Sequence, residues 1–326
     1  MNGRTEKEMI LDKKITEKLQ DYPAIITEFY EDMKDNGKTM MTVKSYTNNV
    51  IHFANAVSGK KIKEDFYKRV TTADIKRYMN SIKISEDENG NPVEVGDEFR
   101  AQRWSALNAF FIFLKDNDYI DENPMNKTKR PRAKVEHTVT YLTPDEIKAV
   151  YRKIQGTANK KFVNRDLCIF TLAVKTGLRV SAICNINIKD IDFNENTITV
   201  VEKGKKKRQI MFGDNMKEML KAWIKDRKTY FKEIETDALF VSQFKKRITT
   251  DMVRVLIKKY TDGVTTKHIT PHKLRASCAV NIYDQTKDIM LVRDMLGHEN
   301  VETTMRYTRA AEESKKEAVA FMDELI

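Results

Sequence analysis

The residues with the clearest capacity for chemistry lie in the stretch MLGHENVETTMRYTRA, residues 295–310. It places His298, two arginines and Tyr307 just after the expected end of a helix. A tyrosine phenol can act as a nucleophile when a neighbouring group accepts its proton. Tyrosine is also common in amphipathic helices, so this stretch by itself leaves Tyr307 as either a nucleophile or an ordinary helix residue.

A second histidine and arginine lie near the start of another predicted helix. In ITPHKLRASCAVNIYD, Thr270 is the expected N-cap and Pro271 the first helical residue. His272 and Arg275 are three residues apart, so they share one face at the amino end, where the helix attracts anions. A single HxxR sequence is nevertheless more typical of a structural or capping pair.

A run of cations separates two β-rich segments. NTITVV and RQIMF flank this run, which predicts a hairpin with a basic tip. The cations at or beside the tip are Lys203, Lys205, Lys206, Lys207 and Arg208. A solvated turn explains them as well as an anion contact does.

Composition narrows the class of protein. The chain has 326 residues, a formal net charge of +11 and a sequence pI near 9.3, which favours a polyanionic partner. No apolar run is long enough to span a bilayer, and the first residues lack the apolar core of a secretory signal. Three scattered cysteines form neither a disulfide framework nor a metal-ligand cluster. We therefore expect a cytoplasmic protein without a metal.

Short helices are predicted throughout the first part of the chain. Apolar residues recur at helical spacing in 21–37, 42–57, 71–82 and 99–120. The acidic stretch 85–98 carries two glycines and a proline, which predicts a loop.

A basic linker is expected between Asp121 and Thr143, where the apolar rhythm stops. Two prolines interrupt this stretch, and five cations fall within eight positions. They are Lys127, Lys129, Arg130, Arg132 and Lys134. The linker is either a solvated tether or a segment that lies along a nucleic-acid backbone.

A new domain begins after the linker. Thr143 is the expected N-cap of its first helix, Pro144 the first helical residue, and Glu146 completes a capping box. Further on, DLCIFTLAVKTGLRVSAICNI predicts a buried helix, a break at Gly177 and a new helix from about Arg179.

Four of these motifs together resemble the catalytic domain of the tyrosine recombinase (phage integrase) family, whose members include the Xer recombinases and Cre. TGLRVSAICNI, EKGKKKR, TPHKLRASCAV and MLGHENVETTMRYT have its order and approximate spacing within residues 140–310. The resemblance implies a mainly α fold with a small β-sheet in two domains. A helical, SAM-like core-binding domain (1–122) and the linker (123–142) precede an α/β catalytic domain (143–309) and a tail helix (310–326).

The family pattern falls on Arg179, Lys203, His272, Arg275, His298 and Tyr307. By this resemblance Tyr307 attacks a phosphodiester and keeps the strand end as a 3′-phosphotyrosine. Arg179 and Arg275 hold the phosphate oxygens, because guanidinium groups bind them with directional control. Lys203 protonates the departing 5′-oxygen, and His272 accepts the tyrosine proton or orders the phosphate.

The resemblance implies a site-specific DNA recombinase that needs no cofactor and no metal. Its expected partners are duplex DNA with an inverted-repeat core site, further copies of this chain from dimer to tetramer, and an accessory directionality protein. Such an enzyme works at the nucleoid. The residues expected to contact DNA are Lys44, Lys127, Lys129, Arg130, Arg132, Lys205, Lys206, Lys207 and Arg208. A type IB topoisomerase and a catalytically inactive DNA-binding protein are the alternatives.

Three departures from the family pattern affect this interpretation. Ala182 occupies the position, three residues after Arg179, where the family usually has a carboxylate. The support that this carboxylate gives the site is therefore missing or supplied elsewhere. Ala276 replaces a frequent histidine, and the basic neighbours of Lys203 leave the general acid open to reassignment within the tip.

The last residues predict an amphipathic helix. In AAEESKKEAVAFMDELI the apolar residues fall on one stripe, which must be buried somewhere. The stripe docks either on its own catalytic domain or, as the family resemblance suggests, on a neighbouring subunit.

Overall fold

The chain forms two compact units, residues 1–135 and 136–326, in the computed structural model. The structure describes residues 3–59, 61–86, 92–132, 139–201, 207–231, 234, 236–308 and 312. Side chains are described from residue 8 onward. Apart from residue 312, the predicted tail helix lies outside these ranges.

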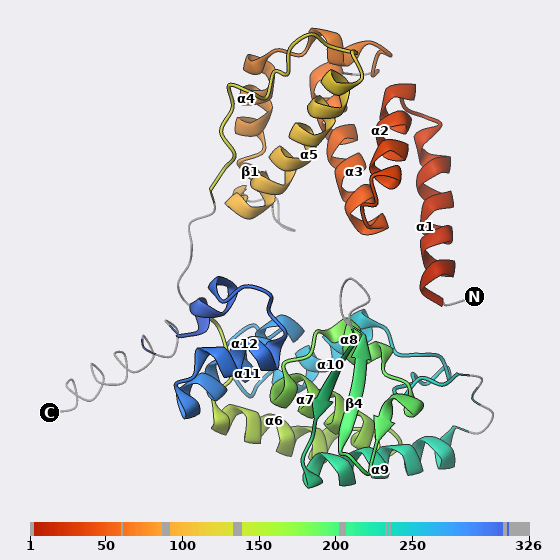
Figure 1. Cartoon of the computed structure of the whole chain (residues 1–326), viewed down its shortest axis with the longest axis vertical. Coiled ribbons are helices and arrows are strands. Elements are labelled where there is room, and N and C mark those ends of the chain that lie inside the picture. Colours follow the sequence, from red (N-terminus) through yellow and green to blue (C-terminus); the bar gives the residue numbers. More distant parts are fainter. Residues whose placement is uncertain are drawn as a thin grey trace, which may run out of the picture. The chain divides into compact units, whose positions relative to one another are not determined.

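The first unit is a bundle of helices around an aromatic core (Figure 1). Its helices are α1 (Gly3–Leu19), α2 (Ala24–Asp35), α3 (Met40–Ser58), α4 (Thr72–Ser81) and α5 (Asp97–Asp116), with a short 3-10 helix at Phe66–Arg69. Phe29, Phe53 and Phe110 are each at most 1% exposed, and Phe29 meets Phe110 edge to face. The helices predicted from apolar spacing are all present, whereas α1 was not predicted.

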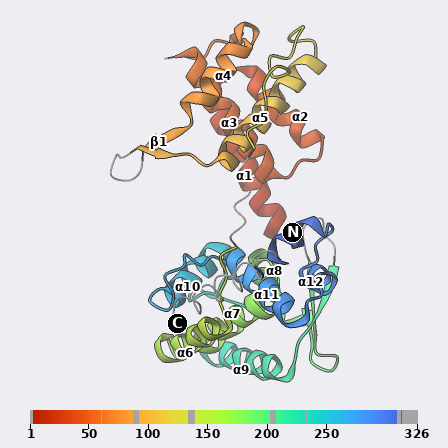
Figure 2. The same cartoon turned by 90° about the vertical axis from the view of Figure 1, so that its left-hand side faces the viewer.

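A small hairpin corrects the loop predicted for residues 85–98. Strands β1 (Ile84–Glu86) and β2 (Pro92–Glu94) pair antiparallel, with Ser85 opposite Val93 (Figure 2). Each strand is three residues long, and the side chains of β2 are all exposed. A strand that buries neither face needs no alternation of apolar and polar residues, so the sequence carries no signal for it.

The first unit continues past residue 122, where the sequence placed the start of the linker. Met125 is 1% exposed and belongs to the aromatic core. The Trp104 indole donates a hydrogen bond to the hydroxyl of Thr128 at 2.9 Å, and Thr72 donates to the carbonyl of Pro124 at 2.9 Å. Residues 123–128 therefore pack as part of the helical bundle.

The second unit combines helices with a small antiparallel sheet (Figure 1). The strands β3 (Ile191–Asp192), β4 (Thr197–Val201) and β5 (Lys207–Met211) lie in the order β3-β4-β5. The helices are α6 (Pro144–Thr157), α7 (Val163–Thr176), α8 (Val180–Asn185), α9 (Asp214–Tyr230), α10 (Thr250–Thr261), α11 (Pro271–Thr286) and α12 (Ile289–Leu296). The mainly α, two-domain fold predicted from the family resemblance is confirmed.

Two helices of this unit, α6 and α11, start at the capping residues that the sequence predicted. The Thr143 side chain accepts from the N–H of Glu146, and the Glu146 carboxylate accepts from the N–H of Thr143, which completes the predicted capping box. Thr270 caps α11 by accepting from the N–H of Lys273. These caps satisfy N–H groups that the first helical turn leaves without a helical partner.

Gly177 ends α7 and lets the chain turn into α8. Its φ of +61° lies in the left-handed region, which disfavours residues with a Cβ. A Cβ built at this position would lie 2.5 Å from Cδ2 of Leu296. The turn thus requires glycine for two reasons, namely its backbone conformation and the close approach of Leu296, the last residue of α12.

Gly177→Ala is expected to lower the free energy of unfolding of the second unit by about 2–4 kcal/mol, from left-handed strain and overpacking. Urea unfolding in a Trp104→Phe background measures this, because the buried Trp223 then reports on the second unit alone. Gly156→Ala is the matched control. It lies in α6 with nothing within 4 Å of the added Cβ, so it should leave stability unchanged or raise it by up to about 1 kcal/mol. Equal effects of the two substitutions would contradict the argument.

Candidate active site

Five of the six predicted catalytic residues come from four segments of the second unit. Arg179 is the residue before α8, and His272 and Arg275 lie in the first two turns of α11. His298 follows the left-handed Gly297 that ends α12, and Tyr307 lies in a helical segment over residues 302–308. Lys203 lies outside the described residues.

The guanidinium of Arg275 joins two of these segments. It is 3% exposed, and it donates to the carbonyl of Gly177 at 2.6 Å and to the carbonyl of Leu296 at 2.7 Å. Each carbonyl belongs to the residue two positions before a predicted catalytic residue, Arg179 in one case and His298 in the other. Arg275 therefore fixes the turns that present both side chains.

Tyr307 is buried against α11 and α12. It is 1% exposed and packs in a cluster with residues such as Ala276, Val280 and Leu296. Its ring is stacked with that of His298, at 6.3 Å between centroids and 21° between planes. The His298 Nδ1 atom lies 2.9 Å from the hydroxyl of Thr304, which holds the imidazole in this orientation.

Arg306 also belongs to the site, although the family pattern did not mark it. Its Nη2 atom donates to the Tyr307 hydroxyl at 2.7 Å and lies 3.3 Å from Nε2 of His272. Its guanidinium lies 4.8 Å from the centroid of the Tyr307 ring. The sequence carries only a weak signal for this role, namely an arginine directly before the tyrosine. Adjacent helix residues ordinarily point in different directions, so this neighbour was not expected to reach the tyrosine hydroxyl.

Burial and the surrounding cations both favour the neutral form of the two histidines. Loss of water around the ring lowers the pKa of His272, although the residue is exposed, and Arg306, Arg275 and Arg179 lower it further. Burial, followed by the charges of Arg275 and Arg179, lowers the pKa of His298 to about 4. A neutral imidazole can accept a proton, which a histidine already protonated cannot do.

Arg208, one of the residues expected to contact DNA, lies against the end of α12. Arg208 Nη1 donates to the carbonyls of Asp294 at 3.1 Å and Met295 at 2.8 Å, at the carboxyl end of α12. A cation at a helix carboxyl end satisfies carbonyls that have no helical partner. Arg208 thus binds its own chain, whereas its neighbour Lys207 is exposed on β5. Lys205 and Lys206 lie outside the described residues.

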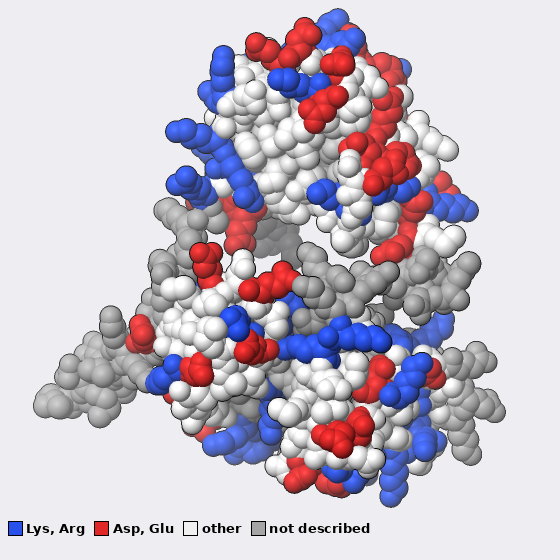
Figure 3. Space-filling model, viewed as in Figure 1, with Lys and Arg blue, Asp and Glu red and all other residues white. Residues whose placement is uncertain are grey.

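The remaining predicted DNA contacts belong to the first unit. Four of them are exposed, namely Lys127, Lys129, Arg130 and Arg132, while Lys44 on α3 is partly buried. On the face that Figure 3 shows, Lys and Arg side chains of this unit gather along one edge, and Asp and Glu gather toward the opposite edge. Such separation of charge gives a polyanion a preferred side of the unit.

Ala182, which stands where the family usually has a carboxylate, makes only apolar side-chain contacts. It is 4% exposed and packs in the main apolar core of the second unit. Any carboxylate that supports the site must therefore come from a different position.

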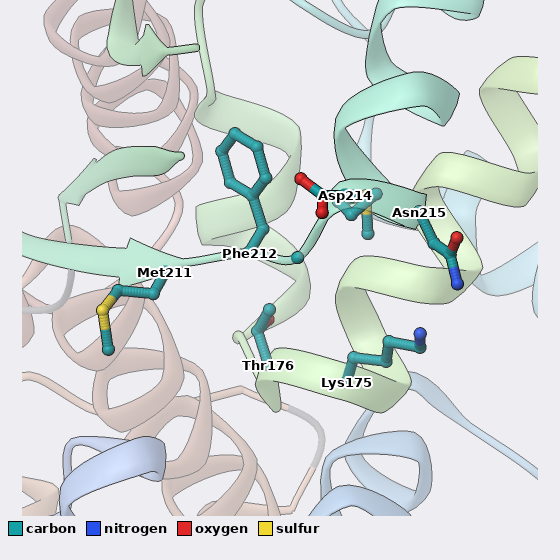
Figure 4. A pocket seen from close by; sticks show the side chains of 8 residues that line it. Lys175, Thr176, Met211, Phe212, Asp214 and Asn215 are labelled. Atoms are coloured by element: carbon teal, nitrogen blue, oxygen red, sulfur yellow. The ribbon is translucent and has the colours of Figure 1, made fainter. Parts of the chain in front are cut away.

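A cavity of about 480 Å³ lies away from these residues. It is lined by Lys175 and Thr176 of α7, by the end of β5, and by residues at the start of α9, including Asp214 and Asn215 (Figure 4). None of the predicted catalytic residues that the structure describes lines it.

No group of three or more His, Cys, Asp or Glu side chains in the described part of the chain is placed to hold a metal ion. The helices of the described residues are too short or too polar to cross a membrane. Cys168, Cys184 and Cys278 are buried free thiols.

The chain matches the family model described as "Phage integrase family" over residues 140–314. It is 30% identical over 327 aligned positions to "Tyrosine recombinase XerC" of Caldanaerobacter subterraneus subsp. tengcongensis, which covers 91% of this chain and 86% of the relative. The corresponding XerC of Thermodesulfovibrio yellowstonii is 29% identical, over 79% of this chain and 90% of the relative.

Solved structures share the fold at low identity. The XerH site-specific recombinase bound to palindromic difH substrate superposes with a TM-score of 0.68 at 18% identity, over 87% of this chain and 80% of that one. A lambda integrase (75–356) dimer bound to a COC′ core site superposes with a TM-score of 0.64 at 18% identity, over 87% of this chain and 94% of that one.

The low pKa of His298 predicts a pH effect on stability. The folded histidine takes up its proton near pH 4, whereas an unfolded one does so near about 6.5. Between these values the unfolded chain binds more protons, so the free energy of unfolding falls as the pH falls. His298→Gln is expected to remove about 1–2 kcal/mol of that loss, allowing for solvent screening. Urea unfolding of both proteins at about pH 7 and about pH 4.5 measures it, and an equal loss in the variant contradicts the prediction.

Proposed function

This chain belongs to the phage integrase family. We propose that it acts as a site-specific tyrosine recombinase, which cleaves and rejoins DNA through Tyr307. The observation that carries the proposal is the surrounding of the Tyr307 hydroxyl. A guanidinium donates to it at 2.7 Å, and a neutral histidine lies within reach of the same guanidinium. These are the groups that an attacking phenol needs, a cation for its oxygen and an acceptor for its proton.

The proposed cleavage is an in-line exchange at one phosphate. The Tyr307 oxygen forms a bond to phosphorus as its proton passes to His272, and the bond from phosphorus to the 5′-oxygen breaks. Lys203 supplies the proton that the departing 5′-oxygen takes up. Arg179 and Arg275 neutralise the charge that develops on the phosphate oxygens. The 3′-phosphotyrosine that remains is attacked by another 5′-hydroxyl to rejoin the strands.

The proposed substrate is duplex DNA that carries an inverted-repeat core site. The XerH structure holds a palindromic difH substrate, and the lambda integrase structure holds a dimer of that protein on a COC′ core site. By analogy, this chain assembles on DNA as a dimer to tetramer at the nucleoid, with an accessory protein setting direction. Both units contact the duplex, and the tail docks on a neighbouring subunit.

The curated relatives favour recombination over the other two activities considered. Both are named tyrosine recombinases, and the catalytic residue types are present apart from the alanine at position 182. This supports strand exchange rather than relaxation of supercoils or DNA binding without cleavage.

Tyr307→Phe is expected to abolish covalent protein–DNA adducts while site binding stays nearly intact, because it removes one oxygen and little volume. A pool of nicked duplexes with randomised inverted-repeat arms is incubated with protein, and adducts that resist SDS are recovered and sequenced. The wild type should enrich a defined site. Tyr283→Phe is the matched control, since Tyr283 packs against the same apolar cluster, and it should still form adducts. Adducts with the Tyr307 variant, or none with the wild type, would overturn the proposal.

Lys203→Ala is expected to stop cleavage of the enriched site and to recover on a substrate with a 5′-bridging phosphorothiolate. Sulfur leaves without a proton, so the missing acid is no longer needed. Arg275→Ala should not recover, since that guanidinium also holds the turns before Arg179 and His298. Rescue of Lys205→Ala or Lys206→Ala instead would assign the acid to a different residue of the tip.

A further inference from the structure

Arg306 contacts both the proposed nucleophile and its proposed base. A single atom, Nη2, lies 2.7 Å from the Tyr307 oxygen and 3.3 Å from Nε2 of His272. The same guanidinium lies over the tyrosine ring at 4.8 Å. None of the residues that the family pattern marks in this sequence is Arg306.

The chemistry of a guanidinium fixes the direction of both contacts. Arginine has N–H donors, no acceptor, and stays charged at any pH at which proteins fold. The contact with His272 therefore requires a lone pair on Nε2, which places the proton of the neutral ring on Nδ1. The contact with Tyr307 likewise directs an N–H at a lone pair of the phenol oxygen.

We propose that Arg306 is a further catalytic residue of the recombinase, which stabilises the negative charge that develops on the Tyr307 oxygen and keeps Nε2 of His272 available as the proton acceptor. This inference rests on the proposed function. In the attack, the O–H bond of Tyr307 breaks, its proton moves to Nε2, and the oxygen lone pair forms the bond to phosphorus. The bond to the 5′-oxygen breaks as Lys203 protonates it.

The two contacts differ in length in a way that suits this step. A distance of 3.3 Å is long for a hydrogen bond, so Nε2 gives up little when it takes the phenol proton instead. The contact at 2.7 Å is short and charge-assisted, and it strengthens as the oxygen becomes an anion. Arg306 thus favours the phenolate more than the phenol.

Arg306 also acts through the charge that it places beside His272. The cations that face this histidine are Arg306 in the helical segment 302–308, Arg275 on α11 and Arg179 at the start of α8. Loss of water around the ring lowers the pKa of His272 most. Of the three charges, Arg306 has the largest effect. Removing it leaves His272 protonated, and so unable to accept a proton, up to a higher pH.

The test is the pH profile of single-turnover cleavage on the nicked site enriched by the wild type, with protein in excess. Arg306→Gln is expected to lower the rate at the plateau about tenfold, since a hydrogen bond to a developing charge is lost at a solvent-accessible position. It should also move the acid limb of the profile to higher pH. Arg306→Lys keeps the charge without the two-sided contact, so it should retain the acid limb near that of the wild type and still lose rate at the plateau.

Arg254→Gln is the matched control, because Arg254 is an exposed arginine on α10 that pairs with Asp251 outside the site. Its profile should match the wild type. If the Arg306→Gln variant cleaves more slowly but the acid limb of its pH profile matches that of the wild type, Arg306 has only a structural role and the inference is overturned. Faster cleavage would overturn it too, by showing that Arg306 restrains Tyr307. In both cases adducts at Tyr307 persist, so the proposed function stands, whereas its own failure appears as adducts that survive Tyr307→Phe.

Discussion

The site of the second unit depends on one buried cation. Arg275 brings a full charge into the protein interior, which is unfavourable unless hydrogen bonds replace its water. The carbonyls of Gly177 and Leu296 supply such bonds at 2.6 and 2.7 Å, and they belong to turns more than 100 residues apart in the sequence. Because each turn leads directly to a residue of the site, the bonds that stabilise the buried charge also set the positions of Arg179 and His298.

The same region concentrates positive charge around two neutral rings. Burial lowers the pKa values of His272 and His298, and Arg179, Arg275 and Arg306 lower them further. Like charges held together in the absence of an anion destabilise the folded state, and an incoming phosphate relieves that repulsion. The net charge of +11 adds a long-range attraction to the local one. The site is therefore organised for an anionic substrate, with its proton acceptors unprotonated before that substrate arrives.

Much of the fold was predictable because local rules govern it. The capping box of Thr143 and Glu146 and the start of α11 at Pro271 depend on residues near them in the sequence, and the glycine at position 177 marks the break after α7. Helix α1, the hairpin β1–β2 and the packing of Met125 were not predicted. An exposed two-stranded hairpin shows no burial pattern, and an apolar residue in a basic segment gives no sign of the distant core that it joins.

The sequence by itself determined which residue types are available for phosphoryl transfer and, through the family pattern, which positions carry them. Only the tertiary structure decided how two arginines are used. Arg208, which was expected to contact DNA, donates to the carbonyls at the end of α12, and Arg306, which the family pattern did not mark, donates to the Tyr307 hydroxyl. A guanidinium on a flexible stem can reach any acceptor within several ångströms. Its partner therefore depends on which backbone and side-chain groups the folded chain brings near it, and spacing along the sequence does not contain that information.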